Sequence, residues 1–280
     1  MRLSDAFMES LEDTFADIVR KAMLGRGIGR EELSGRLGIE RSDMERVLAG
    51  HMPPSETFAQ MARELFLDPV CLERVAHDPR VEPPVLPDLV QRLVLPFGAW
   101  TVNAWVLLDR SKSHALLIDA GTRALEISSC LSHRNLALSR VLITHNHPDH
   151  VGGLPGLLVS VPGVGIAVPS HLECASHARI LQDRDRLDWE DLHIGVRSTP
   201  GHTADSVSYI VEGLGRTLLI SGDALFARSI GGMSGGMALA IERLKTVMAS
   251  LPPDCLVLPG HGPASTVGDE LKNNPFLAVS

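Results

Sequence analysis

The stretch at residues 141–153, VLITHNHPDHVGG, joins a short apolar run to a dense polar cluster. The run at residues 141–144 is typical of a buried strand in a parallel or mixed sheet. Three histidines and an aspartate follow within six residues. They lie on the loop that leaves the strand end, where α/β folds collect functional groups. The stretch therefore predicts an α/β fold with a functional site at this strand end.

The polar cluster has the composition of a metal site. His145 and His147 are two residues apart, so in an extended loop both rings point to one side. Asp149 and His150 follow Pro148, a favoured first residue of a helix, so their side chains can converge from the helix start. Neutral imidazoles and carboxylates suit zinc and iron, whereas the same groups in a plain surface loop would add little packing. The cluster therefore predicts a divalent metal site.

Four ordered motifs resemble those of the metallo-β-lactamase-fold hydrolases. The first is the histidine and aspartate cluster at residues 145–150, and the others are TPGHT at 199–203, ISGD at 220–223 and LPGHGP at 258–263. The resemblance covers about residues 88–280, and four motifs in order are far more specific than one. It implies the α/β fold of that family, an αββα sandwich of two mixed sheets.

The resemblance also implies which residues bind metal. By the family's motifs, the first site matches His145, His147 and His202, the second matches Asp149, His150 and His261, and the bridging carboxylate matches Asp223. A shared carboxylate and a bridging hydroxide offset the repulsion between two divalent ions about 3.5–4 Å apart. The expected cofactors are two divalent metal ions, with zinc first and iron or manganese as alternatives.

The same resemblance implies a hydrolytic mechanism. A metal-bound water whose pKa is lowered to about 7 supplies hydroxide as the nucleophile near neutral pH. Asp149 is the expected catalytic residue, which accepts and returns a proton. Residues 222–231, GDALFARSIG, and the region after His261 resemble short glyoxalase II-like proteins. This implies hydrolysis of a small thioester or related ester, such as a hydroxyacylglutathione.

Two features depart from full-length glyoxalase II. Only 19 residues follow His261, so the carboxy-terminal helical domain that binds glutathione in that enzyme is not expected here. The arginine often found just after Ser-Ile-Gly is also replaced, since the sequence continues with Gly232 and Met233.

Other functions stay open beside thioester hydrolysis. A persulfide dioxygenase would hold one iron through His145, His202 and Asp223, although the complete second site argues against it. A transcriptional regulator with a metallo-β-lactamase-fold sensor domain would explain the helical amino-terminal region, although a sensor has little need of both metal sites. Lactone hydrolysis would use the same metal pair. A nucleic-acid phosphodiesterase is disfavoured because the chain has a net charge of −8 and only 4% aromatic residues.

Composition bounds the class of protein. A chain of 280 residues with 44% hydrophobic content suits one large domain plus a small one. It has no apolar run of about 18 residues, so we expect no membrane span. The first 12 residues carry Asp5, Glu9 and Glu12 and lack the apolar segment of a secretory signal. We therefore expect a cytoplasmic protein, with its scattered cysteines reduced.

Residues 1–80 have a helical pattern without a convincing strand. Residues 30–50 predict a helix, a glycine turn and a second helix, with an apolar seam that includes Leu33, Leu37 and Val47. The layout resembles the helix-turn-helix domains of the Cro and phage-repressor type. However, residues 1–80 contain 11 Lys and Arg against 15 Asp and Glu, whereas DNA readers need local positive charge. We therefore expect packing against the catalytic domain or a second subunit of a homo-oligomer. DNA binding is not favoured.

Residues 81–87, VEPPVLP, contain three prolines and predict a semi-extended linker between this domain and the catalytic domain at 88–280. The expected strands beyond the linker are 89–97, 103–108 and 115–119 in the first sheet, and 192–198, 206–211, 216–221 and 255–258 in the second. A helix is expected at 237–251.

Two smaller features complete the interpretation of the catalytic domain. Asp119 ends a predicted strand, where it either caps the following helix or, as in metallo-β-lactamase relatives, partners a ligand histidine. Residues 169–192 predict a charged helix. We expect His171, His177 and His193 to be solvated and to bind no metal.

Overall fold

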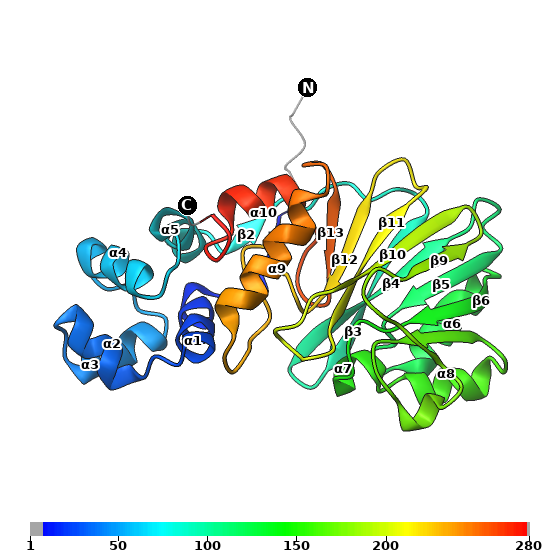
Figure 1. Ribbon diagram of the computed structural model, residues 1–280, viewed down its shortest axis with the longest axis horizontal. Coiled ribbons are helices and arrows are strands. Elements are labelled where there is room, and N and C mark those ends of the chain that lie inside the picture. Colours follow the sequence, from blue (N-terminus) through cyan, green and yellow to red (C-terminus); the bar gives the residue numbers. More distant parts are fainter. Residues whose placement is uncertain (1–7, 279–280) are drawn as a thin grey trace.

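The computed structural model describes residues 8–278 and consists of two six-stranded sheets packed face to face between layers of helices (Figure 1). In spatial order the first sheet contains β3 (Val90–Phe97), β4 (Trp100–Leu108), β5 (His114–Ile118), β6 (Ala137–Leu142), β7 (Gly165–Val168) and β8 (Arg179–Ile180). The second contains β14 (Ser265–Thr266), β13 (Leu256–Pro259), β12 (Leu218–Gly222), β11 (Val207–Glu212), β10 (Leu192–Ser198) and β9 (Arg186–Trp189).

Both sheets are mixed. Strands β5 to β8 run parallel, as do β12 and β13, and every other neighbouring pair in the two sheets is antiparallel. The predicted αββα sandwich of two mixed sheets is confirmed.

Successive side chains of a strand point to opposite faces of the sheet, so one strand packs against the layers on both sides. In β4, Trp105 and Leu107 belong to the core between the sheets, while Val106 and Leu108 pack with the helices on the outer face. Both faces of this strand are therefore buried, which explains its nearly continuous apolar sequence.

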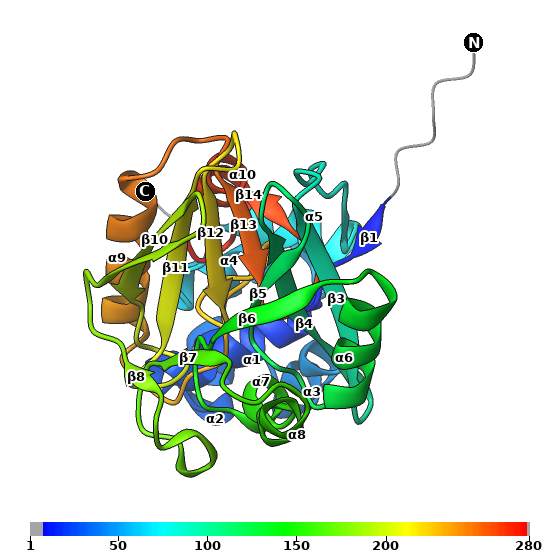
Figure 2. The same cartoon turned by 90° about the vertical axis from the view of Figure 1, so that its right-hand side faces the viewer.

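Helices cover the two outer faces of the sandwich. Helices α6 (Ala124–His133) and α8 (Leu154–Ser160) pack on the first sheet (Figure 2). Helices α9 (Met237–Ala249) and α10 (Val267–Asn273) pack on the second. The short helices α7 (Pro148–Val151) and η1 (Glu173–Ala175) lie in the connections after β6 and β7.

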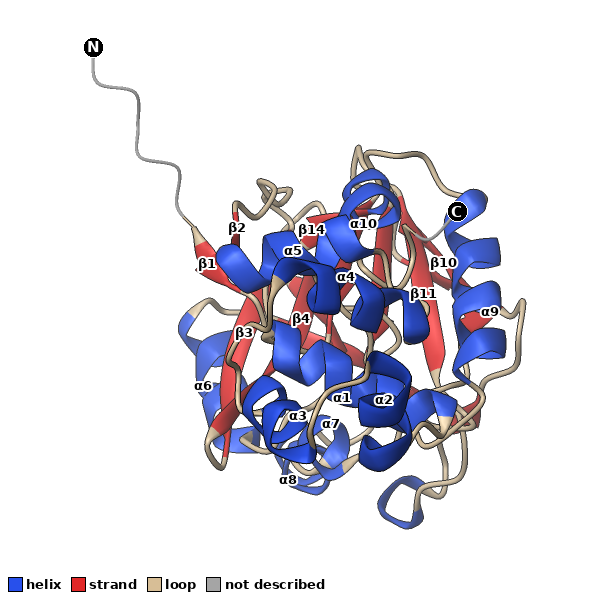
Figure 3. Cartoon of the chain, turned by 90° about the vertical axis from the view of Figure 1, so that its left-hand side faces the viewer, coloured by secondary structure: helices blue, strands red, loops and turns tan. Residues whose placement is uncertain are grey.

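The amino-terminal helices form a further layer beyond α9 and α10 (Figures 1 and 3). They are α1 (Phe15–Arg26), α2 (Arg30–Leu37), α3 (Arg41–Leu48), α4 (Ser55–Glu64) and α5 (Pro69–His77). Ile18 and Leu65 from this layer belong to the same apolar cluster as Met237 of α9 and the carboxy-terminal Phe276. The amino-terminal helices therefore share their core with the sandwich. The domain division at 1–80, 81–87 and 88–280 stays a prediction.

Helix α1 is fixed at both ends by its own sequence. Thr14 and Asp17 form a capping box, in which each side chain accepts a hydrogen bond from the other residue's backbone N–H. Gly27 ends the helix with a left-handed φ of 69°. Before α1, β1 (Glu9–Ser10) pairs antiparallel with β2 (Arg80–Val81), so the prediction of no strand in residues 1–80 is wrong here.

The prediction of a charged helix at residues 169–192 is also wrong. This segment contains η1, the strand β8 and the strand β9. In β9, the side chains of Arg186 and Asp188 are exposed while those of Leu187 and Trp189 are buried. This alternation has the period of a strand, and the high density of charges in the segment concealed it.

Among residues 8–278, no helix is both long enough and apolar enough to cross a bilayer. Asp5, which contributed to the expectation for the amino terminus, lies outside the described residues. The cytoplasmic location stays a prediction.

Candidate metal centre

The loops that follow four strands bring the predicted ligands to one edge of the sandwich. His145 follows β6, His202 follows β10, Asp223 directly follows β12, and His261 follows β13. Parallel and neighbouring strands end at a common edge, which is why residues so far apart in the sequence meet there.

Helix α7 and its cap supply the remaining predicted ligands. His147 is the cap of α7, and Pro148, with its fixed φ, opens the helix. Asp149 and His150 therefore stand on the first turn of α7, and the His150 side chain is fully buried. All seven residues predicted from the sequence lie together.

The ligand atoms fall into three overlapping groups, in each of which they lie within 4.8 Å of one another. One group is His145, His147 and His202, the second is Asp149, His150 and His261, and the third is His145, His150 and Asp223. Asp223 lies between the first two groups. Its carboxylate oxygens are 3.3 Å from His150 Nε2, 3.4 Å from His202 Nε2 and 3.5 Å from His261 Nε2.

Three of the imidazoles are oriented by acceptors on their outer side. His150 Nδ1 donates to Asp119 Oδ2 at 2.7 Å. His202 Nδ1 donates to the Gly232 carbonyl at 2.8 Å, and His261 Nδ1 donates to the Thr101 carbonyl at 2.7 Å. These acceptors place the proton on Nδ1. Each Nε2 consequently faces the interior of the cluster.

The cluster fits bound metal, because three of its buried polar atoms lack hydrogen-bond partners. His145 Nε2, His150 Nε2 and Asp223 Oδ1 are buried and have no hydrogen-bond partner. Buried polar atoms are normally hydrogen-bonded, and leaving one unpaired costs about 1–3 kcal/mol. All three atoms are of metal-ligating type, so divalent cations bound beside them would satisfy them.

Asp119 partners His150, one of the predicted ligands, rather than a helix. Its carboxylate accepts from His150 Nδ1, and from the Thr144 backbone N–H and hydroxyl at 2.8 Å each. Helix α6 begins only at Ala124, with Arg123 as its cap, so the helix-capping alternative does not hold. Asp119 has a left-handed φ of 60°, which Asp tolerates better than most residues.

The charges within the cluster shift several pKa values. Burial lowers the pKa of His145 to about 4, and the neighbouring His150 adds to this effect. Burial also acts to lower the pKa of His150, but the carboxylates of Asp119 and Asp223 outweigh it and raise that pKa well above its ordinary value. A divalent cation would replace the proton there, because the same carboxylates attract either one.

The three histidines that were predicted to be solvated are exposed. His171, His177 and His193 all stand on the surface, and none belongs to the ligand cluster.

Several residues that border the cluster were not predicted from the sequence. Thr101 and Gly232 contribute only carbonyl oxygens, which no side-chain pattern reveals. Glu12 packs against the loop after His261, since a Cβ added at Gly262 would lie 3.1 Å from Glu12 Cβ. Burial raises the pKa of the Glu12 carboxyl, with the charge of His261 opposing it. The amino-terminal segment thus reaches the edge of the candidate metal centre.

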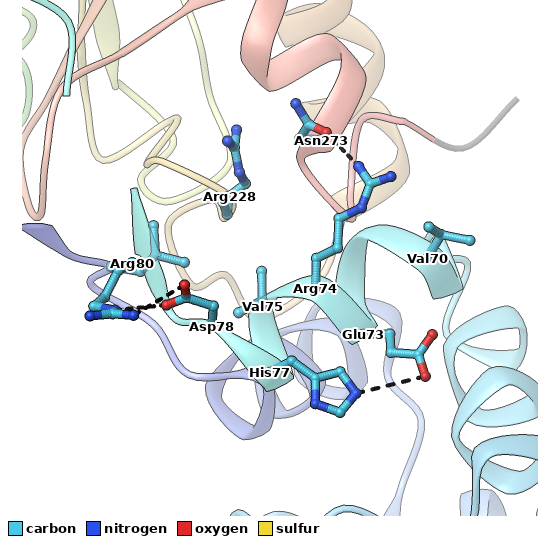
Figure 4. Close-up of a pocket in the computed structure, with 10 residues that line it drawn as sticks. Val70, Glu73, Arg74, Val75, His77, Asp78, Arg80, Arg228 and Asn273 are labelled. Carbon is cyan, nitrogen blue, oxygen red and sulfur yellow. Dashed lines mark hydrogen bonds and ion pairs between the residues drawn. The ribbon is translucent and has the colours of Figure 1, made fainter. Parts of the chain in front are cut away.

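A separate hollow of about 570 Å³ lies between α5 and the α10 region, with Arg74, Arg80 and Arg228 in its walls (Figure 4). Arg80 pairs with Asp78, and Arg74 donates to Asn273 Oδ1 at 2.8 Å. None of the seven clustered ligands lines this hollow, and its guanidinium groups are already engaged. We assign it no ligand.

Comparisons with known proteins agree with this site. The Metallo-beta-lactamase superfamily profile matches residues 97–261. A hydroxyacylglutathione hydrolase of Aeromonas salmonicida is 32% identical over 169 residues, which are 60% of this chain and 64% of that protein. An uncharacterized protein of Mycobacterium leprae is 30% identical over 215 residues, covering 65% of this chain and 96% of its own length.

Solved structures share the same fold. The crystal structure of the BLEG-1 B3 metallo-beta-lactamase superposes with a TM-score of 0.58 at 27% identity, covering 67% of this chain and 99% of that one. The matched residues include all seven clustered ligands, since each lies between positions 97 and 261. The chain belongs to the metallo-beta-lactamase superfamily.

Proposed function

We propose that this chain is a dinuclear metal-dependent hydrolase that cleaves a small thioester or related ester, similar to the hydroxyacylglutathione hydrolases. The observation that carries this proposal is the convergence of seven side chains of metal-ligating type, three of which have a buried atom without a hydrogen-bond partner. Similarity to a hydroxyacylglutathione hydrolase supports the choice of substrate class. That similarity covers 64% of the relative's length, so the substrate itself belongs to the proposal.

The three geometric groups suggest how the residues divide. In our assignment, His145, His147 and His202 hold one metal, Asp149, His150 and His261 hold the other, and Asp223 bridges them. Two divalent ions, zinc by preference and iron or manganese as alternatives, would lower the pKa of bound water to about 7 and polarise the substrate carbonyl.

Asp149 is our candidate for the catalytic proton acceptor. Its Oδ2 lies 3.2 Å from His261 Nε2, and its side chain is 14% exposed, whereas that of His150 is fully buried. Burial acts to raise the pKa of Asp149, but the hydrogen bond from His261 and the charge of His150 lower it below its ordinary value. Asp149 is therefore ionised near neutral pH and able to accept a proton.

The amino-terminal helices offer little support for a regulator that binds DNA. Arg41, at the start of α3, the second helix of the helix-turn-helix-like pair, pairs with Glu31 at 3.5 Å and Glu45 at 3.0 Å. These acids compete with phosphate for the guanidinium group. We propose that this layer serves the catalytic body by packing on it, and the homo-oligomer stays a prediction.

The test joins metal analysis to a substrate panel. We expect about two metal ions per chain by elemental analysis, and turnover of a hydroxyacylglutathione thioester above that of lactones. Asp149→Asn should lower kcat by about 10²–10⁴-fold, because it removes a proton acceptor. Wild-type protein that is fully loaded with at most one metal contradicts the two-metal scheme. Oxygen uptake with glutathione persulfide, coupled to sulfite formation and faster than any hydrolysis, would assign the dioxygenase instead.

A further inference from the structure

The loop at residues 223–232, which follows β12, touches both proposed metal sites. It begins with the central carboxylate of Asp223. The Phe226 ring stands edge-on to His261, with centroids 5.7 Å apart and planes at 81°. The carbonyl of Gly232 accepts the hydrogen bond from His202 Nδ1. One loop therefore supplies a ligand, packs against a second ligand and orients a third.

A lysine from the amino-terminal layer fastens this loop. Lys21, on α1, donates from Nζ to the Ile230 carbonyl at 2.9 Å and pairs with Asp13 at 2.5 Å. Its ammonium also lies 4.8 Å from the centroid of the Phe226 ring. The Lys21 side chain is only 19% exposed, and a charge this buried persists only where it is paired and hydrogen-bonded. Lys21 meets both conditions through this loop and Asp13.

The loop has little room to move without disturbing the ligands. A Cβ added at Gly231 would lie 1.9 Å from the Asp223 carbonyl oxygen and 3.1 Å from His202 Nδ1. Ile230, which Lys21 holds, precedes this tight point by one residue. A shift of the loop at Ile230 would therefore be transmitted to the acceptor of His202.

The middle of the loop is anchored independently, two residues before Ile230. Arg228 pairs with Asp269 at 2.6 Å and with the fully buried Glu270 at 3.2 Å (Figure 4 shows the position of Arg228). The Ile230 carbonyl accepts from Lys21 Nζ and, at 3.4 Å, from the hydroxyl of the adjacent Ser229. Among the described residues, Lys21 is the one residue of the amino-terminal layer that donates to it.

We propose that Lys21 is a positioning residue for the metal centre: it fixes the loop at Ile230 so that the Gly232 carbonyl keeps His202 Nε2 directed at the metal. Lys21 lies outside residues 97–261, so it belongs to the amino-terminal layer that the family profile does not include. The inference rests on the proposed metal ligands. Under this proposal, the amino-terminal layer helps to position a metal ligand.

The experiment compares metal binding in three single variants of the full chain. Lys21→Met removes the ammonium, and Lys21→Arg restores a cationic donor. Arg20→Met is the matched control, since Arg20 also lies on α1, pairs with an aspartate (Asp17) and donates to a backbone carbonyl, that of Leu48 within the amino-terminal layer. The apo proteins are titrated with Zn²⁺ in competition with a chelator, and Co²⁺ spectra report ligand geometry.

We expect Lys21→Met to weaken binding of one of the two metals by about 10–100-fold, the usual range for groups that orient a ligand histidine. The Co²⁺ spectrum should change as well. Lys21→Arg should recover most of the affinity, and Arg20→Met should bind both metals as the wild type does. Unchanged affinities and spectrum in Lys21→Met would overturn the proposal, as would an equal loss in Arg20→Met.

A second variant covers the case in which Lys21→Met does not fold. Asp13→Asn keeps the lysine but removes its carboxylate partner, and it should weaken the same metal by a smaller factor. Wild-type affinity in Asp13→Asn would then refute the positioning role. Failure of the proposed function looks different: the wild type binds two metals and Lys21→Met loses one, while no thioester is hydrolysed.

Discussion

Replacing Asp119 by Asn tests whether the buried carboxylate orients His150 as the structure indicates. The carboxylate accepts three hydrogen bonds, one on Oδ1 from the Thr144 N–H and two on Oδ2 from the Thr144 hydroxyl and His150 Nδ1. Asn keeps the shape and tolerates the left-handed backbone. Its amide nitrogen, however, must take the place of one oxygen and there meets at least one donor.

The size of the effect follows from those contacts. If the amide nitrogen faces His150, that ring is driven toward the tautomer with its proton on Nε2, the atom required by the metal. If it faces the Thr144 N–H, a buried donor loses its acceptor, which costs about 1–3 kcal/mol. Loss of a partner that orients a ligand histidine lowers metal affinity by about 10–100-fold. This corresponds to about 1.4–2.8 kcal/mol.

The assay is Zn²⁺ titration against a chelator at pH 7.5, with thermal unfolding of the apo protein beside it. Asp205→Asn is the matched control, because Asp205 accepts from Thr203 and Ser170 near the site and from no ligand imidazole. The weaker of the two metals should be lost from Asp119→Asn and kept by the control. If Asp119→Asn binds both metals as tightly as the wild type, the orienting role is wrong.

Three further outcomes are expected. Burial raises the pKa of Glu270 from 4.5 to about 7 despite its pairing with Arg228. Between pH 4.5 and 7 the folded state therefore holds one proton more than the unfolded state, and the free energy of unfolding falls as pH rises through that window. Urea unfolding at pH 5 and 8 should show Glu270→Gln flattening this dependence by up to about 3 kcal/mol. His202→Ala should bind no more than one metal tightly by elemental analysis, whereas retention of two contradicts our ligand assignment. Removing residues 1–80 should lower the Tm in calorimetry by uncovering α9, and an unchanged Tm would show that the shared core is dispensable.

The resemblance of four ordered motifs to the metallo-β-lactamase family was enough to predict which residues lie together. The structure gives the physical reason, since each motif follows a strand end and neighbouring strands of a sheet end together. Strand positions were also predicted closely where the apolar pattern is strong. The expected strand at 192–198 coincides with β10, and the one at 89–97 differs from β3 by one residue. The prediction of a helix at residues 169–192 failed because the many charged residues obscured the alternation of exposed and buried side chains in β9.

What the sequence could not reveal is the set of groups that hold the ligands in place. Thr101 and Gly232 act through carbonyl oxygens, which every residue possesses. Lys21 resembles any charged residue on an amphipathic helix, and its contact with Ile230 spans 209 residues of sequence. Such contacts depend on how the amino-terminal layer packs, which local periodicity does not encode.

The shared core of the amino-terminal helices and the carboxy-terminal end also sets an order of events during synthesis. Helices α1 to α5 emerge from the ribosome well before their apolar partners Met237 and Phe276 are made. At about 5–20 residues per second, the nascent helices wait on the order of ten seconds or more with their apolar face uncovered. Contacts of such long range also slow folding. A newly made chain is therefore expected to need chaperone protection for longer than a sandwich whose first strands pair at once.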